Sequence, residues 1–316
     1  MDKRKKKIIQ VLDLVSLLID YLVIFVLIVV FLYGLYGFLD VENMYRDAEA
    51  KNFTSYKPEK ESKVNYSFEE LKVKNKDLIG WLDIYGTTID YPLVQGEDNL
   101  KYLNTDIFGN YTAVGSIFLD SRNSGRFEET NNVIYGHHMA HRAMFGDIGL
   151  FEEKSFFDSH RYGNLHFKGR DFGIKILAYF KTHGDDSIVY DIKLRGQDKI
   201  KRFLSHIDKL SKFDRINDLS IGDIGRQKFV VLSTCTEETG GRQILLGVLS
   251  DEKYENKFAE DNLEEKLTFK FSDNSYKILL YISAAIFFAS LLIWILCLAI
   301  EKKLKNIDRK EKNKFK

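Results

Sequence analysis

One thiol, Cys235, stands between an apolar run and a polar segment rich in glycine. The run Phe229–Leu232 is short, continuous and made of bulky or β-branched residues, which is typical of a buried strand. The residues that follow, Ser-Thr-Cys-Thr-Glu-Glu-Thr-Gly-Gly, have the composition of a turn. Arg242 then opens a second apolar stretch, Ile244–Leu249. Cys235 is therefore predicted at a strand end, and a turn of this size can bring Arg242 back beside it.

A thiol becomes a useful nucleophile when a neighbouring base or cation favours the thiolate. His137 ends another predicted strand, 98 residues before Cys235, and Arg242 lies seven residues after it. We expect the three to meet at one rim of the fold as nucleophile, general acid/base and oxyanion-binding guanidinium. Two alternatives stay open at this point. Cys235 can be a buried structural cysteine, and His137 can be structural, being one of seven histidines.

Other candidate residues have weaker support. Thr234 either donates near the oxyanion or only packs, and Ser116 either lines a peptide groove or faces a neighbouring strand. Cys297 lies inside an apolar run and offers Cys235 no disulfide partner. His138 and His141 are predicted to be structural and exposed, respectively. The Cys and His spacing does not fit a metal site, and the acidic loops do not fit an EF-hand, so we predict neither metal nor cofactor.

The segment around these residues has a β-rich pattern. Short apolar runs with turn signals predict strands at Trp81–Ile84, Thr88–Val94, Ile117–Leu119, Asn132–Tyr135, Leu165–Phe167, Lys175–Thr182, Phe229–Leu232 and Ile244–Leu249. Apolar residues at helical spacing predict one amphipathic helix, Gln197–Phe213. A capping box of Ser67 and Glu70 predicts a short helix that ends near Asn75. The predicted fold is a mainly β barrel with helical additions rather than an α/β sandwich.

Two segments have the length and composition of membrane spans, residues 14–38 and 278–300. The first has an uncharged core, Tyr21–Phe38. A cleaved signal peptide is the alternative for it, but its apolar region is long and lacks a small-residue cleavage site, so a retained anchor is favoured.

Charge predicts the orientation of the spans. The two terminal tails carry a combined charge of +9, which places both in the cytoplasm by the positive-inside rule. The whole chain has a net charge of +1, and two aspartates lie in residues 8–38, so about −6 remains outside. That charge argues against a nucleic-acid ligand. The predicted layout is tail 1–13, span 14–38, extracellular stalk with helices 39–77, catalytic domain 78–250, connector 251–277, span 278–300 and tail 301–316.

Several short motifs, taken in order from about Leu78 to Leu249, resemble the sortases, membrane-anchored cysteine transpeptidases of Gram-positive bacteria. The sequence Leu-Ser-Thr-Cys at 232–235 follows Gly-His-His-Met at 136–139 and precedes Arg242. The class B branch is resembled by the segments Ile89–Gly96, Tyr102–Asn104, Gly115–Asp120 and Ile134–Met139, and by a helix inserted before the nucleophile strand.

The resemblance implies an eight-stranded β-barrel and a defined set of roles. Cys235 would attack the backbone carbonyl of a C-terminal sorting signal on a secreted protein, typically at a threonine. His137 would protonate the leaving amine, and Arg242 would hold the substrate and the oxyanion. The thioester acyl-enzyme would then be released by an amine, either of a cell-wall precursor or of a pilin lysine, at the cell membrane.

The chain departs from the family pattern in three places. Val231 stands where the family usually has threonine, and an acidic pair, Glu237-Glu238, lies between Cys235 and Arg242. A second span is more typical of pilus-assembling sortases, yet the Asp-Pro-aromatic lid of their usual class is missing. Two other functions stay open, a hydrolytic thiol protease and a non-catalytic two-span scaffold with a sensory outer domain.

Overall fold

The structure of the chain is a computed structural model. It describes residues 3–58, 66–139, 142–219, 225–235 and 240–259, together with twelve residues between 281 and 300. For residues 3–8, 42, 66, 67 and 235 it describes the backbone alone. The predictions made for His141, Glu237-Glu238, Cys297 and the tail 301–316 lie outside the described residues.

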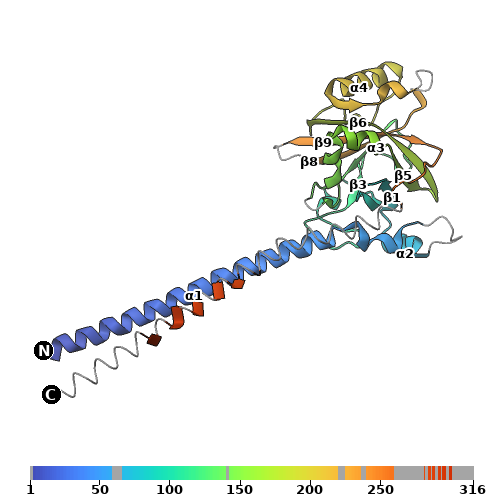
Figure 1. Ribbon diagram of the computed structural model, residues 1–316. Helices are drawn as coiled ribbons and strands as arrows, with labels where there is room; N and C mark the ends of the chain where they lie inside the picture. The colour runs from blue at the N-terminus through green and yellow to red at the C-terminus, as the bar shows by residue number, and fades with distance from the viewer. Residues whose placement is uncertain are drawn as a thin grey trace. The chain divides into compact units, whose positions relative to one another are not determined.

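Eight strands close into a barrel, as the sequence predicted (Figure 1). The sheet runs in the order β5-β1-β2-β3-β4-β8-β9-β6, pairing of β5 with β6 closes it, and β7 adds to the free edge of β6. The strands are β1 Leu78–Ile84, β2 Asp90–Val94, β3 Ile117–Leu119, β4 Asn131–Tyr135, β5 Tyr162–Phe167, β6 Arg170–His183, β7 Ser211–Asp214, β8 Phe229–Cys235 and β9 Gly241–Ser250.

Alternate residues of the central strands supply two apolar cores. On β8, Val230 and Leu232 belong to the core inside the barrel, whereas Val231 belongs to a second core shared with helix α4, Gln197–Leu210. Because strand side chains point alternately to opposite faces, one continuous apolar run can fill both layers. This explains why Phe229–Leu232 shows no alternation of polar and apolar residues in the sequence.

The predicted helix Gln197–Phe213 is confirmed as far as Leu210 and wrong beyond it. Ser211 has an extended backbone, and its hydroxyl donates to the carbonyl of Ile207 at 2.8 Å, which satisfies one of the last helical acceptors. Residues 211–214 then pair with β6 as β7. These residues form a strand because they pair with the open edge of β6. A local sequence pattern cannot show where such an edge lies.

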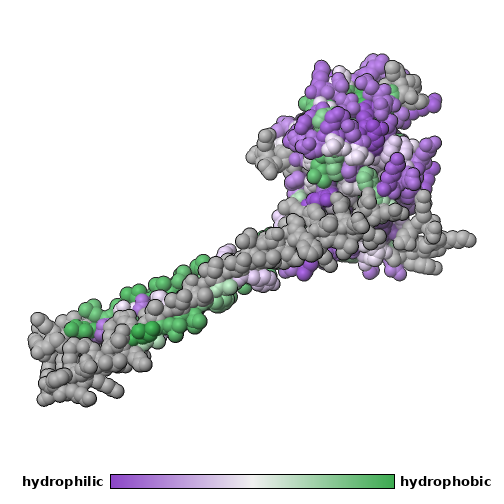
Figure 2. Space-filling view, in the orientation of Figure 1, coloured by the Kyte–Doolittle hydropathy of each residue, from purple (hydrophilic) through white to green (hydrophobic). Residues whose placement is uncertain are grey.

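Helix α1, Lys3–Asp47, is long and apolar enough to cross a membrane. Figure 2 shows hydrophobic residues over much of α1 and mainly hydrophilic residues on the barrel surface in view. In the part of the chain that the structure describes, α1 alone meets the length and hydropathy requirements. The twelve described residues of the second predicted span are helical, but they do not confirm a second span.

The end of α1 joins the barrel directly. Ala48 is buried, and its carbonyl accepts a hydrogen bond from the hydroxyl of Tyr91 on β2 at 2.9 Å. Met44 and Tyr45 pack against the core inside the barrel. A short α2, Tyr66–Lys74, follows, so Ser67 lies inside the helix and its prediction as N-cap is wrong, although the predicted helix end is confirmed. Other short helices are η1 Ala50–Asn52, η2 Thr54–Tyr56, η3 Lys101–Leu103, η5 Gly146–Glu152, α3 Lys154–Ser159 and η6 Ile216–Asp218.

Candidate active site

Strand β8 places Cys235 between two neighbouring strands. On one side β4 runs parallel to β8, with Tyr135 opposite Ser233, so His137 and Cys235 each stand two residues farther along the chain. On the other side β9 runs antiparallel, and Arg242 is the direct partner of Cys235. The backbone therefore brings the three predicted positions together at one rim of the barrel, although they span more than a hundred residues of sequence.

His137 is half-buried and makes one hydrogen bond, between its Nε2 and the carbonyl oxygen of Leu103 at 2.9 Å. A carbonyl can only accept, so Nε2 carries the hydrogen. The lone pair of the neutral ring is then on Nδ1, for which the described residues offer no partner. This arrangement leaves one ring nitrogen available to take up and release a proton.

The loop after His137 is held by a buried ion pair. Arg142 donates from Nε and Nη2 to the two carboxylate oxygens of Asp147 at 2.7 and 2.9 Å, and Asp147 also accepts the backbone N–H of Thr88 at 2.7 Å. Arg142 has a φ of 62°, a left-handed conformation that costs free energy for a non-glycine residue. The loop closes when the N–H of Phe145 donates to the carbonyl of His137 at 3.0 Å. Asp147 thus fixes the backbone on which His137 is carried.

Arg242 is half-buried and makes few contacts. Its Nη1 donates to the adjacent carbonyl of Gly241 at 3.0 Å, and its guanidinium lies about 3.4 Å from where a Cβ on Gly184 would be. Among the described residues it forms no ion pair. Within the described residues its charge and most of its donors are thus not taken up by other groups, as a guanidinium that binds a substrate carbonyl or an oxyanion requires.

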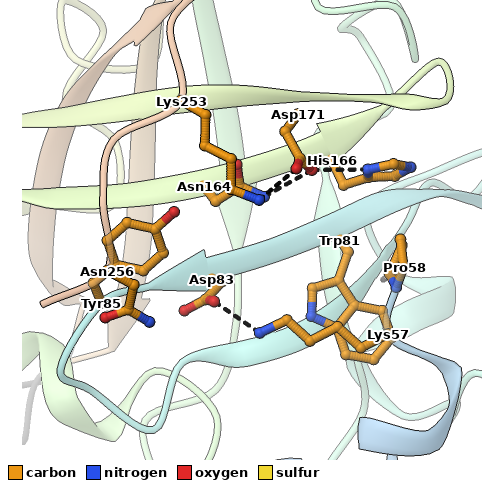
Figure 3. Close-up of a pocket in the computed structure, with 10 residues that line it drawn as sticks. All are labelled: Lys57, Pro58, Trp81, Asp83, Tyr85, Asn164, His166, Asp171, Lys253 and Asn256. Carbon is orange, nitrogen blue, oxygen red and sulfur yellow. Dashed lines mark hydrogen bonds and ion pairs between the residues drawn. The ribbon is translucent and has the colours of Figure 1, made fainter. Parts of the chain in front are cut away.

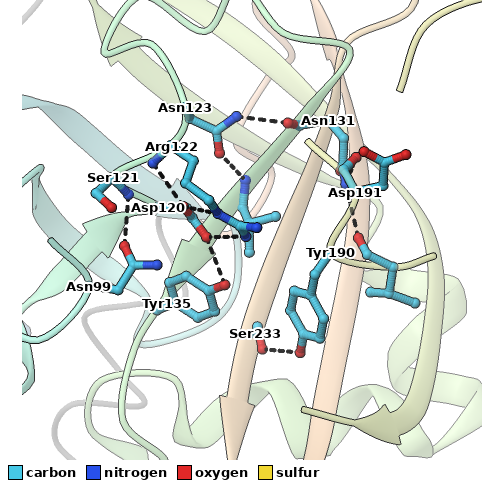
Figure 4. Close-up of polar contacts among 12 residues, drawn as sticks. Asn99, Asp120, Ser121, Arg122, Asn123, Asn131, Tyr135, Tyr190, Asp191 and Ser233 are labelled. Carbon is cyan, nitrogen blue, oxygen red and sulfur yellow. Dashed lines mark hydrogen bonds and ion pairs between the residues drawn. The ribbon is translucent and has the colours of Figure 1, made fainter. Parts of the chain in front are cut away.

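Tyr190, from the connection between β6 and α4, covers the strands next to the rim (Figure 4). Its hydroxyl is 2.9 Å from that of Ser233 on β8, and its ring stacks on Tyr135 of β4 with centroids 6.3 Å apart. Tyr135 and Ser233 are each two residues before the positions of His137 and Cys235. The aromatic pair thus forms a wall beside the predicted site, which the sequence did not reveal.

A buried carboxylate fixes Tyr135 from behind. Asp120, fully buried, accepts the hydroxyl of Tyr135 at 2.9 Å and two hydrogen bonds from Arg122 (Figure 4). Burial alone would raise the pKa of Asp120, but the hydrogen bonds from Arg122 and Tyr135 and the charge of Arg122 together outweigh it and hold the pKa below its usual value. Asp120 is the last residue of Gly115–Asp120, a segment that resembles the class B branch in sequence. The sequence therefore pointed to this residue but not to its role in holding Tyr135.

The two tentative residues are buried. Thr234 is 2% exposed, and its hydroxyl has no hydrogen-bond partner in the described structure, which supports the packing alternative. Ser116 is 4% exposed and donates to the carbonyl of Thr105 at 2.8 Å, and it is one of the residues that line a cavity of about 550 Å³. His138 is exposed and its backbone bridges to Met144.

A second polar region is a cavity of about 140 Å³ (Figure 3). It is lined by residues of β1, β5 and β6, by Lys57 and Pro58 before α2, and by Lys253 and Asn256 after β9. Lys57 lies 2.8 Å from a carboxylate oxygen of Asp83 and 2.8 Å from one of Asp90. Burial, followed by repulsion from Asp90, raises the pKa of Asp83 to about 6.

On the other wall of this cavity, Asp171 accepts from His166 at 2.9 Å and forms an ion pair with Lys253. The hydrogen bond from His166 is the largest of the effects that lower the pKa of Asp171. The charged groups of the cavity are thus paired with one another.

Comparisons with known proteins agree with the barrel and the site. No family model matches the chain. It is 31% identical over 189 residues to sortase B of Listeria monocytogenes, a match that covers 59% of this chain and 75% of that protein. It is 29% identical over 174 residues to sortase B of Staphylococcus aureus, a match that covers 55% of this chain and 69% of that protein.

Among solved structures, a Streptococcus pyogenes class B sortase involved in pilus biogenesis superposes with a TM-score of 0.53 at 37% identity. The superposition covers 58% of this chain and 98% of that one. Sequence identity over most of a curated relative and an equivalent barrel lead to the same assignment. The chain belongs to the class B sortase family.

Proposed function

We propose that this chain is a membrane-anchored cysteine transpeptidase that cleaves a C-terminal sorting signal of secreted proteins and transfers the new end to an amine. The observation that supports the proposal is the strand register, which pairs Cys235 with Arg242 and pairs Tyr135 with Ser233, each two residues before His137 and Cys235. A thiol between an imidazole and a guanidinium has the groups that acyl transfer requires: nucleophile, proton carrier and oxyanion donor.

In the first half-reaction the thiolate of Cys235 attacks the carbonyl carbon of the scissile peptide bond, typically that of a threonine. The guanidinium of Arg242 donates to the oxyanion of the tetrahedral intermediate. The C–N bond then breaks, the imidazolium of His137 gives its proton to the departing nitrogen, and a thioester links the substrate to Cys235.

In the second half-reaction an amine attacks the thioester carbonyl, neutral His137 takes a proton from it, and the thiolate departs. A new amide bond replaces the one that was cut. The amine belongs to a cell-wall precursor or to a pilin lysine. The lysine option is supported by the Streptococcus pyogenes relative involved in pilus biogenesis.

The proposed anchor is α1, with residues 278–300 as a second span, both basic tails in the cytoplasm and the catalytic domain 78–250 outside. The basic residues that flank both apolar segments support this orientation. Protease added to intact protoplasts should digest the central domain and spare both tails. Cleavage within either tail would overturn the two-span topology.

The chemistry is tested with the full chain in detergent, a library of sorting-signal peptides and a set of candidate amines, with products analysed by mass. We expect a covalent adduct on Cys235 followed by an amide-linked product. Release of carboxylic acids alone, at every amine concentration, would identify a hydrolytic thiol protease instead. If no adduct forms and Cys235 reacts with thiol reagents only in denaturant, the chain is a non-catalytic scaffold.

A further inference from the structure

The loop tip Thr105–Tyr111, between η3 and β3, has a rigid backbone. The carboxylate of Asp106 accepts the N–H groups of Phe108 and Asn110, both at 2.8 Å, and the side-chain amide of Asn110 at 3.0 Å. Thr105 and Tyr111 form an isolated antiparallel bridge at the base of the tip. The conformation of the tip is therefore set before it meets any partner.

Two aromatic side chains of this tip are exposed. Tyr111 is 84% exposed and Phe108 is 47% exposed, with Phe108 held edge-on by the ring of Tyr56 at 6.0 Å between centroids. Single exposed aromatics are ordinary. Here two exposed aromatic side chains lie three residues apart on a turn held by hydrogen bonds. An aromatic ring with a polar end, presented in this way, can anchor the protein to a partner.

The same aromatics line a cavity of about 550 Å³, whose opposite wall is the end of the membrane helix. That wall includes Arg46, Lys51 and Phe53. The tip therefore lies across one cavity from the last turn of α1, and no independent linker separates the barrel from the helix, because Ala48 is already buried against it.

The length of α1 between its apolar core and this cavity is short. The uncharged stretch ends at Leu39, and Arg46 follows seven residues later in the same unbroken helix. Seven residues of α-helix rise about 10 Å. The polar layer on each side of a bilayer is roughly 5–8 Å thick. With α1 upright, Arg46 thus lies only a few ångströms outside this layer, and the tilt common in membrane helices brings it and the side chains around the same cavity closer to the lipid headgroups.

We propose that the barrel rests on the membrane surface through this face, with Phe108 and Tyr111 placed in the headgroup layer of the leaflet from which α1 emerges. The partner is a lipid surface, because tyrosine and other aromatic side chains favour this layer. The inference relies on the anchoring role of α1 in the proposed function but not on any catalytic role.

The contact has a consequence for the catalytic rim. Gly115, which lines the cavity, lies so close to the carbonyl oxygen of Leu103 that a Cβ would be 2.4 Å from it. That carbonyl holds the ring of His137. The face on the membrane and the proton carrier are therefore separated by one layer of backbone, and the rim would be held at a fixed height above the lipid surface.

The test uses the full chain in vesicles of phosphatidylcholine and phosphatidylglycerol, with either ordinary or brominated acyl chains. Tyr111→Trp and, separately, Phe108→Trp place an indole on the tip. Leu100→Trp is the matched control, because Leu100 is 70% exposed on the same barrel and does not line the cavity. The parent chain, with Trp81 and Trp294, gives the background to subtract.

We expect the indole at 111 or 108 to emit at shorter wavelength in vesicles and to be quenched by brominated lipid, because aromatic side chains favour the interfacial layer. The indole at 100 should show neither change. Equal emission at all three positions would overturn the proposal, as would quenching at 100 alone. Flotation of the chain with the vesicles separately reports whether α1 anchors it, so a failed anchor and a failed contact are distinguishable.

Discussion

The rim that carries the candidate site and the polar cavity of Figure 3 both bring polar and charged groups from distant segments together, but the charges have different partners. In the cavity, Lys57 is shared by two carboxylates, and Asp171 is shared by His166 and Lys253. At the rim, His137 bonds one backbone carbonyl and Arg242 bonds another.

The difference between paired charges in the cavity and charges without an ion-pair partner at the rim indicates which region can bind a substrate. In the cavity the pKa of Asp83 is raised and that of Asp171 is lowered, and shifted pKa values often identify active sites. Yet its charges are already neutralised by their neighbours, which is the pattern of a structural network. At the rim, the described residues leave one nitrogen of His137 and most donors of Arg242 without a partner, and such unused hydrogen-bonding capacity is what a substrate requires.

The largest expected loss follows removal of the thiol. Cys235→Ala should reduce product formation to background, a loss of about 10⁴-fold or more, because no other group can form the thioester. Cys297→Ala is the matched control and should retain full activity. The measurement is the rate of amide product from one peptide and one amine. Comparable losses in the two variants would show that the chemistry has been assigned to the wrong cysteine.

Removal of the proton carrier should cost less. His137→Ala is expected to lower kcat by about 10²–10⁴-fold, the usual contribution of a general acid/base. Peptide binding, measured with a Cys235→Ala background, should survive. Unchanged kcat in His137→Ala would contradict the assigned role and would transfer it to the exposed His138.

Arg242→Lys keeps the charge but loses the planar fork of donors. We expect a loss of about 10²-fold in kcat, the scale of one oxyanion donor. Because the three groups act as a unit, the His137→Ala, Arg242→Lys double variant should lose little beyond the worse single variant. Full activity in Arg242→Lys would reduce the guanidinium to a long-range electrostatic role.

Much of the barrel could be predicted because its strands carry local signals. β3 was predicted with its observed ends, and the centres of the other apolar strands were found. β7 was not, because Ser211–Asp214 became a strand only through pairing with the edge of β6. The parallel pairing of β4 with β8, which brings His137 to Cys235, joins segments about a hundred residues apart and has no local signature.

Candidate site residues could be predicted only where residue type carries chemistry. Cys235, His137 and Arg242 were proposed in that way. The carbonyl of Leu103 was not, because every residue has one and only the fold decides which meets an imidazole. Tyr190 was missed for a related reason, since it lies in a connection without a motif and reaches β8 by folding over it.

The polar cavity should respond in stability rather than in activity. Lys57→Met leaves Asp83 and Asp90 close together without their shared cation, and we expect a loss of about 2 kcal/mol in the free energy of unfolding. Lys101→Met is the matched control, since its pair with Asp77 is on the surface, and it should cost under about 1 kcal/mol. Thermal and denaturant unfolding of the full chain in detergent measure both, and kcat should be unchanged. A kcat effect in Lys57→Met would place the cavity in the catalytic machinery.

The two walls of this cavity should also differ in how their contribution to stability depends on pH. The pKa of Asp83 is raised from 3.8 to about 6 by burial and by Asp90, against the attraction of Lys57 and Lys253. A raised pKa means that the folded state binds the proton more tightly than the unfolded state. The contribution of Asp83 to stability is therefore complete below pH 3.8 and is lost as pH rises through 6.

The pKa of Asp171 is lowered, chiefly by the hydrogen bond from His166, so its contribution has the opposite sign. It is present above pH 3.8 and is lost as pH falls below that value. Between pH 4 and 6 the stability of the parent chain relative to Asp83→Asn should fall, by up to about 3 kcal/mol. Relative to Asp171→Asn it should stay level in this range and fall only in more acidic solution. Unfolding of the three proteins across pH 3–7 measures both differences, and parallel curves would mean that the two carboxylates do not have the separate environments that their hydrogen bonds indicate.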